Sequence, residues 1–271
     1  MRELKGKVAV VTGGGSGIGA GIVRACARAG MKIAVADIHP ARARLIRDEL
    51  LASGAEAIAV TTDVSRLASV QALAEKVERA FGGVHLVCNN AGVWVGALMQ
   101  EADIKDWRWL INVNLYGVIH GVKVFVPKLV AQREGHIVNT ASMGGLIAGP
   151  PEGLYCTTKF AIVGLSEALL LEVADKGVGV SVLCPGLVKT NLLESEQVRP
   201  KALRTGKKYN VIPPDVASGL DPNEVGQRVV DAVIDNEFYI ITHNDYREFI
   251  KARFDRILDA VDRHAQPYKR G

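Results

Sequence analysis

The chain has 271 residues, of which 48% are hydrophobic, 23% are charged and 28 are glycines, enough for one large α/β domain or two small ones. Its 33 Lys and Arg residues against 29 Asp and Glu residues give a net charge of +4, with both signs mixed along the chain, so neither nucleic acid nor a membrane is indicated as a partner. The four cysteines form no CxxC pair and the histidines show no metal-ligand spacing, so we expect neither disulfides nor a metal site. The first apolar run begins at Val8 and is too short for a signal peptide or a membrane span, which favours a cytoplasmic protein.

Short β-branched runs alternate with stretches of helical periodicity along the chain. Strands are predicted at residues 7–12, 33–36, 57–60, 84–87, 136–139, 179–183 and 238–241. Helices are predicted at residues 17–29, in the Arg-rich stretch after Pro40, and at 67–81, 104–130 and 155–174. Because crossover helices between apolar strands produce a parallel sheet covered on both faces, the sequence predicts one α/β domain over residues 1–271, with a doubly wound, Rossmann-type sheet.

Two segments near the C-terminus lie outside this alternation. Residues 191–220 show no strong period, and a long irregular segment in a compact domain is more often a lid or binding loop than a disordered excursion. Five basic residues and no acid lie between Arg199 and Lys208, which we interpret as a solvated loop face rather than a site for an anionic substrate. A charged amphipathic helix is predicted at 244–263, where it would cover the site or pack against a neighbouring subunit.

A glycine-rich turn, Thr12–Gly19, separates the first predicted strand from the first helix. A pyrophosphate at this position needs backbone N–H groups, a close approach and the positive end of a helix dipole, and side chains would hold it away. The turn therefore predicts a dinucleotide site, although such a turn also occurs for purely structural reasons.

Asp37 ends the second predicted strand, where a carboxylate can accept hydrogen bonds from the adenosine ribose hydroxyls of a dinucleotide. The same carboxylate would repel a 2′-phosphate, and no arginine stands at Ser16 or immediately after Asp37 to offset that repulsion. The sequence therefore favours NAD over NADP. As an alternative, Asp37 caps the helix after Pro40, which does not exclude the ribose role.

The glycine pattern Thr12-Gly13-x-x-x-Gly17-x-Gly19 resembles that of the short-chain dehydrogenase/reductase family, in its shorter, non-epimerase branch. The resemblance extends to about Thr190, in the order and spacing of the family. It implies that the dinucleotide is bound by Gly13, Gly15, Ser16, Gly17, Ile18, Gly19, Asp37, Ile38, Asp63, Val64, Asn90, Ala91, Gly92, Tyr155, Lys159, Pro185, Gly186, Val188 and Thr190.

Tyr155 and Lys159 lie four positions apart on a predicted helix, so both side chains project from one face. Ser142 ends the preceding strand, at the sheet edge where ligands bind in this architecture. A tyrosine with its ordinary pKa of about 10 is a poor base near pH 7, but a neighbouring ammonium and a positive nicotinamide favour the phenolate. We therefore expect Tyr155 to be the general acid/base, Lys159 to lower its pKa, and Ser142 to donate to the substrate oxygen. The family resemblance also gives Lys159 a contact to the nicotinamide ribose.

Three further residues near these positions need an interpretation. Asn114 lies inside the predicted helix 104–130, and the resemblance makes it the fourth catalytic residue, which holds a water linking Lys159 to solvent. The alternative is that this asparagine caps or kinks the helix, where it is otherwise a mild misfit. Cys156 is interpreted as a packing residue, because no histidine lies nearby in the sequence to activate it. For Trp94, a place in the core or an interface is favoured over a substrate contact.

Together these features predict an NAD-dependent oxidoreductase that acts on a small-molecule alcohol or ketone. The loop 143–154 has no charge except Glu152, so we expect a bulky, largely apolar alcohol. NADP-dependent carbonyl reduction on the same scaffold and a non-catalytic NAD-sensing protein are the alternatives. The resemblance further implies a homodimer or homotetramer, formed through the long helices that begin near Ile104 and Tyr155.

Overall fold

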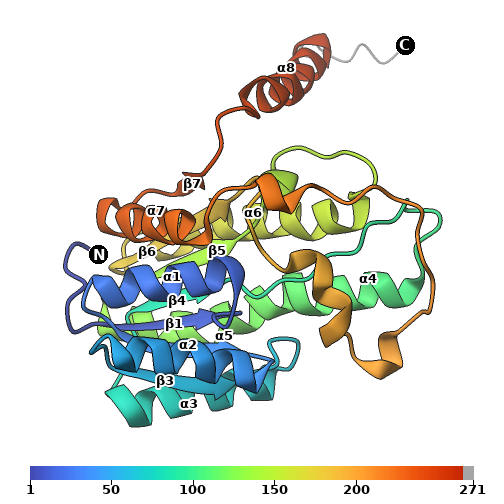
Figure 1. The fold of residues 1–271 in the computed structure, drawn as a ribbon. Coiled ribbons are helices and arrows are strands. Elements are labelled where there is room, and N and C mark those ends of the chain that lie inside the picture. Colours follow the sequence, from blue (N-terminus) through green and yellow to red (C-terminus); the bar gives the residue numbers. More distant parts are fainter. Residues whose placement is uncertain (265–271) are drawn as a thin grey trace.

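The computed structural model describes residues 1–264, and all seven of its strands belong to one parallel sheet (Figure 1). The strands are β1 (Val8–Thr12), β2 (Lys32–Asp37), β3 (Ala57–Thr61), β4 (Leu86–Asn89), β5 (Gly135–Thr140), β6 (Val178–Cys184) and β7 (Tyr239–Ile241). Their order is β3-β2-β1-β4-β5-β6-β7, so the winding direction reverses between β1 and β4. In such sheets the ligand crevice lies outside the carboxyl ends of the strands at the reversal. The predicted Rossmann-type fold is confirmed, and the strand boundaries agree to within two residues.

The described residues form eight α-helices. They are α1 (Gly17–Arg28), α2 (Pro40–Ala52), α3 (Leu67–Phe81), α4 (Ile104–Leu110), α5 (Tyr116–Gln132), α6 (Gly153–Val173), α7 (Pro222–Asp235) and α8 (Arg247–His264). The prediction of one continuous α-helix at 104–130 is wrong in one respect. A π-helical turn over Ile111–Leu115 separates α4 from α5. Asn114, the residue that did not suit a helix interior, lies in this turn and is fully buried.

Helix α7 was not predicted from the sequence. Its N-terminus is nevertheless marked: the Asp221 side chain accepts a hydrogen bond from the backbone N–H of Asn223 at 2.7 Å, and Pro222 is the first helical residue. Buried valines then recur at helical spacing, at Val225, Val229 and Val233. Capping and periodicity together are therefore the signal that could have identified this helix.

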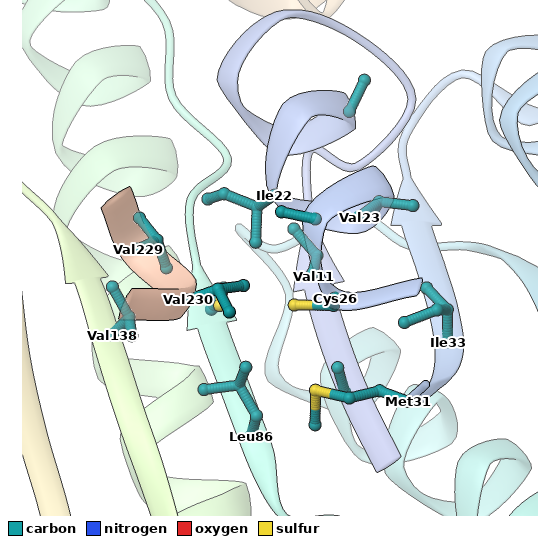
Figure 2. Close-up of a cluster of buried hydrophobic side chains, with 14 of the residues drawn as sticks. Val11, Ile22, Val23, Cys26, Met31, Ile33, Leu86, Val138, Val229 and Val230 are labelled. Atoms are coloured by element: carbon teal, nitrogen blue, oxygen red, sulfur yellow. The ribbon is translucent and has the colours of Figure 1, made fainter. Parts of the chain in front are cut away.

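The alternating side chains of β1 divide the core between the two faces of the sheet. Ala9 and Val11 point toward α1, α2 and α7, whereas Val8 and Val10 point toward α3, α5 and α6. Figure 2 shows the first of these layers, in which side chains of α1 pack with Val11 of β1 and with Val229 and Val230 of α7. All five residues of β1 are buried, as expected for a central parallel strand.

Helices α1 and α7 approach each other closely because glycines lie between them. A Cβ at Gly21 would be 1.9 Å from the backbone oxygen of Pro222, and one at Gly226 would be 2.2 Å from the backbone of Gly21. No side chain fits at either position. This contact fixes α7, and therefore the chain that follows the 191–220 segment, against the helix that begins at the glycine-rich turn.

Two stretches, Ile104–Gln132 and Gly153–Val173, are long and apolar enough to cross a membrane by length and composition. Both pack on the sheet, since Phe125 and Leu129 of the first and Leu169 of the second belong to the buried layer around α3. They are accounted for as core helices, and neither is evidence of membrane insertion.

Residues 191–220 form an irregular segment with three short 3₁₀ turns, at Leu192–Val198, Lys201–Leu203 and Val216–Ser218. The interpretation of its basic stretch as a solvated face is wrong for Arg199, which is 4% exposed and paired with the buried Asp106. Helix α8 follows β7 and projects away from the sheet (Figure 1).

Candidate active site

The turn between β1 and α1 exposes backbone where side chains would otherwise stand. Gly13 has a φ of +65°, and a Cβ there would lie 2.9 Å from the Cα of Ala91. Gly19 packs closely inside the turn, because a Cβ on it would lie 2.1 Å from the Gly13 oxygen. The N-cap of α1, Ser16, makes no side-chain capping hydrogen bond. The first N–H groups of α1 are therefore available to an anion, as a pyrophosphate requires.

Asp37 lies beside this turn and holds it in place. One carboxylate oxygen accepts a hydrogen bond from the backbone N–H of Gly15 at 3.0 Å, and the other accepts one from His39 at 2.8 Å. The alternative role as N-cap of α2 is not observed, since His39 occupies the N-cap and Pro40 begins the helix. The carboxylate remains at the surface of the cleft described below, where ribose hydroxyls can reach it.

The turn is joined to the chain after β4 by the Thr12 side chain. Its Oγ1 accepts hydrogen bonds from the backbone N–H groups of Asn90 (2.9 Å) and Ala91 (3.2 Å), and donates to the Cys88 oxygen at 3.3 Å. The Asn90 side chain returns a hydrogen bond to the Thr12 oxygen at 3.0 Å. The carboxyl ends of β1 and β4 are thus fixed relative to each other at the point where the strand order reverses.

A first cleft runs along this edge of the sheet. The predicted dinucleotide residues that line it are Gly13, Ser16, Gly17, Ile18, Asp37, Ile38, Asp63, Val64, Asn90, Ala91, Gly92, Tyr155, Lys159, Pro185 and Thr190. Gly15 and Gly19 are absent from its lining, because the first donates to Asp37 and the second is packed inside the turn. Gly186 and Val188 line a second cleft instead.

Sequence reasoning missed several residues of the first cleft. Arg42 lines it beside Asp37, brought there by the first turn of α2, whereas the prediction considered an arginine only at position 16 or immediately after Asp37. Asn112 also lines it, from the π-helical turn. The 191–220 segment contributes a further group: Asn191, Leu192, Glu194, Ser195, Val198, Pro200 and Leu203.

Lys159 lies at the base of the first cleft and is 3% exposed. Its Nζ donates to the Thr140 oxygen at 2.8 Å and lies 5.3 Å from the ring centroid of Tyr155. Burial lowers the pKa of Lys159 to about 8. The one-turn spacing predicted for the two side chains is therefore present on α6, and both border the same space.

Burial raises the pKa of the Tyr155 phenol above its usual value, and the nearby Glu152 charge raises it further, while a hydrogen bond with Ser142 lowers it. The expectation that Lys159 lowers this pKa is not met by the protein alone, because burial outweighs every favourable interaction and Lys159 directs its Nζ to Thr140. The phenol is consequently neutral near pH 7 and is a proton donor in this state of the protein.

Ser142 follows β5 by two residues and caps a short 3₁₀ turn, with its Oγ accepting from the Gly144 N–H at 3.1 Å. The hydroxyl donates weakly to the Pro185 oxygen at 3.4 Å. It can rotate toward a ligand oxygen at the cost of one long hydrogen bond, which is the behaviour expected of a donor to a substrate.

The Asn114 amide is bound to the backbone that follows β4. Its Oδ1 accepts from the Val93 N–H at 2.8 Å, and its Nδ2 donates to the Val93 oxygen at 3.0 Å and to Thr158 Oγ1 at 3.3 Å. A Cβ on Gly92 would be 3.5 Å from Asn114 Oδ1 and 3.8 Å from Lys159 Nζ, so both groups border that glycine. The π-helical turn agrees with the alternative that Asn114 interrupts the regular helix. It also brings the Asn114 amide to Gly92, which Lys159 borders as well.

A second cleft also borders Tyr155. Tyr155, Ile18, Pro185, Thr190 and Leu192 line both clefts. Its apolar walls include Met143, Ile147, Pro150, Leu187, Val216 and Phe249, and Trp94 also lines it rather than lying only in the core. Cys156 borders it as a buried thiol, with a pKa that burial raises, so no reactive thiolate is present there.

The chemistry of the first cleft fits a dinucleotide. Bare glycine backbone and unused helix N–H groups suit a pyrophosphate, the Asp37 carboxylate suits ribose hydroxyls, and Lys159 lies at the opposite end. In residues 1–264 no group of three potential His, Cys, Asp or Glu ligands is close enough to hold a metal ion. The fold and the cleft together define a Rossmann-type, dinucleotide-binding protein.

Comparison with known proteins agrees with this assignment. Residues 7–200 match the model for short chain dehydrogenases. A short chain dehydrogenase/reductase from Burkholderia phymatum, solved in complex with NAD, is similar at a TM-score of 0.90 and 41% identity, over 95% of this chain and 96% of that one. A C alpha-dehydrogenase from a Sphingobium species is 33% identical over 96% of this chain and 88% of its own length. A cyclohexanol dehydrogenase from an Acinetobacter species is 36% identical over 73% of this chain and 80% of its own length.

The chain belongs to the short chain dehydrogenase family. The protein is accordingly an oxidoreductase with a site for a nicotinamide cofactor, as the resemblance in the sequence predicted.

Proposed function

We propose that the protein interconverts a bulky, largely apolar secondary alcohol and its ketone with NAD, using Tyr155 as the general acid/base. The observation that supports this most directly is the position of Tyr155, which lines both clefts. A phenol shared by the cofactor side and the apolar side can exchange a proton with a substrate that faces the cofactor.

A nicotinamide bound in the first cleft would supply the hydride acceptor for oxidation of the carbinol carbon and the hydride donor for reduction of the carbonyl carbon. In the oxidation, the Tyr155 oxygen takes the hydroxyl proton of the alcohol as the C=O bond forms. In the reduction, the neutral phenol donates its proton to the carbonyl oxygen, which matches its raised pKa. Ser142 donates to the same oxygen, where negative charge develops. Lys159, held by Thr140 and lining the first cleft, would bind a ribose hydroxyl of the cofactor.

The preference for NAD is supported by Asp37, whose carboxylate lines the first cleft and would repel a 2′-phosphate. NADP-dependent carbonyl reduction is the second candidate, and one observation favours it: Arg42 lines the same end of the cleft and can pair with a phosphate. Asp37 is held by two backbone N–H groups and cannot turn away without breaking them, so we favour NAD.

The substrate class is supported by the walls of the second cleft. They present Met143, Ile147, Leu187 and Phe249 beside Ser142 and Tyr155, so a substrate that buries apolar surface there gains the most. The related cyclohexanol dehydrogenase is named for an apolar cyclic secondary alcohol, which is the kind of compound that these walls suit.

We also propose a cytoplasmic protein that assembles as a homodimer or homotetramer. All four cysteines are free and buried, which suits a reducing compartment. Helix α8 exposes Phe249, Phe254, Leu258 and other apolar side chains, which a second copy of the chain would cover.

The experiment is a panel of secondary alcohols and ketones assayed with the purified full-length protein by NADH absorbance, with NADP and NADPH in parallel. Turnover of cyclic and aromatic alcohols with NAD is expected. Activity restricted to small polar polyols would contradict the substrate class, and a strong preference for NADP would support the second candidate. Binding of NAD without turnover of any compound would favour a non-catalytic, NAD-sensing protein.

A further inference from the structure

The second cleft contains one charge in an otherwise apolar wall. Among its lining residues in the described part of the chain, Glu152 is the only charged side chain. It lies three residues before Tyr155, at the N-terminus of α6, so the carboxylate and the phenol are neighbours on one side of the helix. A carboxylate beside the reacting group affects which substrates can enter.

The Glu152 side chain does not cap the helix that it precedes. Glu152 is the N-cap of α6, where the positive end of the helix dipole favours a carboxylate, but its side chain makes no capping hydrogen bond. Its Oε1 instead accepts from the indole Nε1 of Trp94 at 3.3 Å, and Trp94 lines the same cleft. The carboxylate is therefore directed to the cleft and not to the helix.

In the described part of the chain, no basic side chain pairs with this carboxylate. None of the ion pairs among residues 1–264 includes Glu152. Burial is the main cause of the raised pKa of Tyr155 on one wall and of Tyr246 on another. The Glu152 charge adds to both shifts, and Asp245 also contributes at Tyr246, so the field of the Glu152 carboxylate reaches both walls. Within residues 1–264, the long hydrogen bond from Trp94 is the one that the Glu152 carboxylate accepts. A carboxylate can accept about four hydrogen bonds, so most of its acceptor sites face the cleft without a protein donor.

We propose that Glu152, oriented by Trp94, is the specificity-determining residue of the second cleft and selects alcohols and ketones that present a hydroxyl donor away from the reacting carbon. The inference rests on the proposed function and names its substrate class more closely. A neutral hydroxyl is favoured over an ammonium group, because the surrounding walls are apolar and a cation would lose its hydration there. Carboxylate and phosphate substrates are excluded by like-charge repulsion in a poorly solvated space.

The test uses one parent compound and three derivatives with the purified full-length protein and NAD. The parent is 1-phenylethanol, and the derivatives add a hydroxyl, a carboxylate or an aminomethyl group to the ring, at the meta or the para position. We expect kcat/KM for the better hydroxyl isomer to exceed that of the parent about tenfold, since a hydrogen bond to a charged acceptor is among the stronger ones. The carboxylate derivative should react at least about tenfold more slowly than the parent.

Two substitutions separate charge from hydrogen bonding. Glu152→Gln keeps an acceptor and removes the charge, so discrimination against the carboxylate derivative should disappear while part of the hydroxyl preference remains. Glu152→Leu should abolish both. Because every compound uses Tyr155, the ratio between substrates cancels any effect of Glu152 on the Tyr155 pKa. Glu172→Gln, which makes the same change at an exposed position of α6, is the matched control and should leave the ratios unchanged.

The outcomes also distinguish the two levels of the proposal. If the wild-type protein turns over none of the compounds or their ketones, the proposed function fails. If it turns over 1-phenylethanol but the ratios are the same in wild type, Glu152→Gln and Glu152→Leu, then only the role of Glu152 is overturned. Preference for the aminomethyl derivative over the hydroxyl derivative would overturn the substrate class. The wild-type ratios alone test the class even if a variant does not fold.

Discussion

The Arg199 guanidinium donates to the Asp106 carboxylate, with Nη2 2.6 Å from Oδ1, and so fastens the 191–220 segment to α4. The two side chains are 3% and 0% exposed. The guanidinium also lies 4.8 Å from the ring centroid of Trp109, and the Tyr209 hydroxyl donates to the other Asp106 oxygen. Since the same segment lines the first cleft, this pair determines how firmly the cleft is covered.

Replacing Arg199 with leucine leaves the Asp106 carboxylate buried without its cation, a change that costs about 3–5 kcal/mol in typical proteins. We expect the cost to appear as local opening of the segment, with faster amide hydrogen exchange over 192–209 and weaker cofactor binding. Hydrogen-exchange mass spectrometry and a titration with NAD measure the two effects. Lys201→Leu, an exposed change in the same basic stretch, is the control. Unchanged protection in Arg199→Leu would show that the pair does not hold the segment.

Tyr155→Phe removes only the phenol oxygen. Turnover should fall by about 10²–10⁴-fold or more, the range for loss of a general acid/base, while NAD affinity changes little. NADH absorbance measures the first and calorimetric titration the second. Tyr116→Phe, at an exposed position of α5, should behave like wild type in both assays. Near-normal turnover in Tyr155→Phe would show that another group exchanges the proton.

Much of the fold could be predicted because its signals are local. The β-branched runs and the glycine-rich turn identify strands and the dinucleotide turn from a few adjacent residues, and the register of Tyr155 and Lys159 follows from one turn of helix. Helix α7 was missed although its signal is also local, because Asp221 and Pro222 follow the irregular segment directly and were not interpreted as a helix start.

The features that could not be predicted from the sequence depend on contacts between residues far apart in the chain. Arg199 was interpreted as a solvated residue because its partner Asp106 lies 93 positions away and no pattern in either segment indicates the pairing. Lys159 and a bound nicotinamide were expected to lower the pKa of Tyr155, but the sequence does not show the burial that raises this pKa in the protein alone. Arg42 lines the first cleft because the chain after β2 places the first turn of α2 beside Asp37, and that path is not evident from the sequence.

Asp37→Asn tests the basis of the cofactor preference with little change of shape. The carboxamide keeps one acceptor for the Gly15 or His39 N–H group but loses the charge that faces the ribose. NAD affinity should fall about tenfold, and discrimination against NADP should relax. Titration with both cofactors measures this, and Arg42→Ala is the complementary variant, expected to weaken NADP more than NAD. A strong preference of the wild-type protein for NADP would contradict the argument.

The exposed apolar side chains of α8 predict an assembled state in solution. Phe254, Ile257, Leu258 and Val261 are each at least 45% exposed in the single chain. Light scattering coupled to size exclusion should give a dimer or tetramer, and Ile257→Asp together with Leu258→Asp should shift the population toward smaller species. Asp259→Asn, on the same helix, is the control. A monomer in wild type at micromolar concentration would contradict the assembly.

His136 makes the stability of the fold sensitive to acid. It lies fully buried in β5, with Nε2 2.7 Å from Ser181 Oγ and no hydrogen-bond partner for Nδ1 within the residues described. Because the Ser181 hydroxyl donates to the Glu237 oxygen, the imidazole must donate to Ser181, which a neutral ring with its proton on Nε2 does. Burial lowers the pKa of His136 to about 3.

The unfolded chain binds a proton at this histidine below its ordinary pKa of about 6.5, whereas the folded chain does not until about pH 3. The contribution of His136 to stability is therefore complete above about pH 6.5 and is lost as the pH falls toward 3, amounting to about 3 kcal/mol by pH 4. Urea unfolding at pH 7 and pH 4 measures the loss in wild type and in His136→Gln, where it should be smaller by about that amount. His39→Gln, at an exposed position, should lose as much as wild type. An equal loss in His136→Gln would assign the acid sensitivity to other groups.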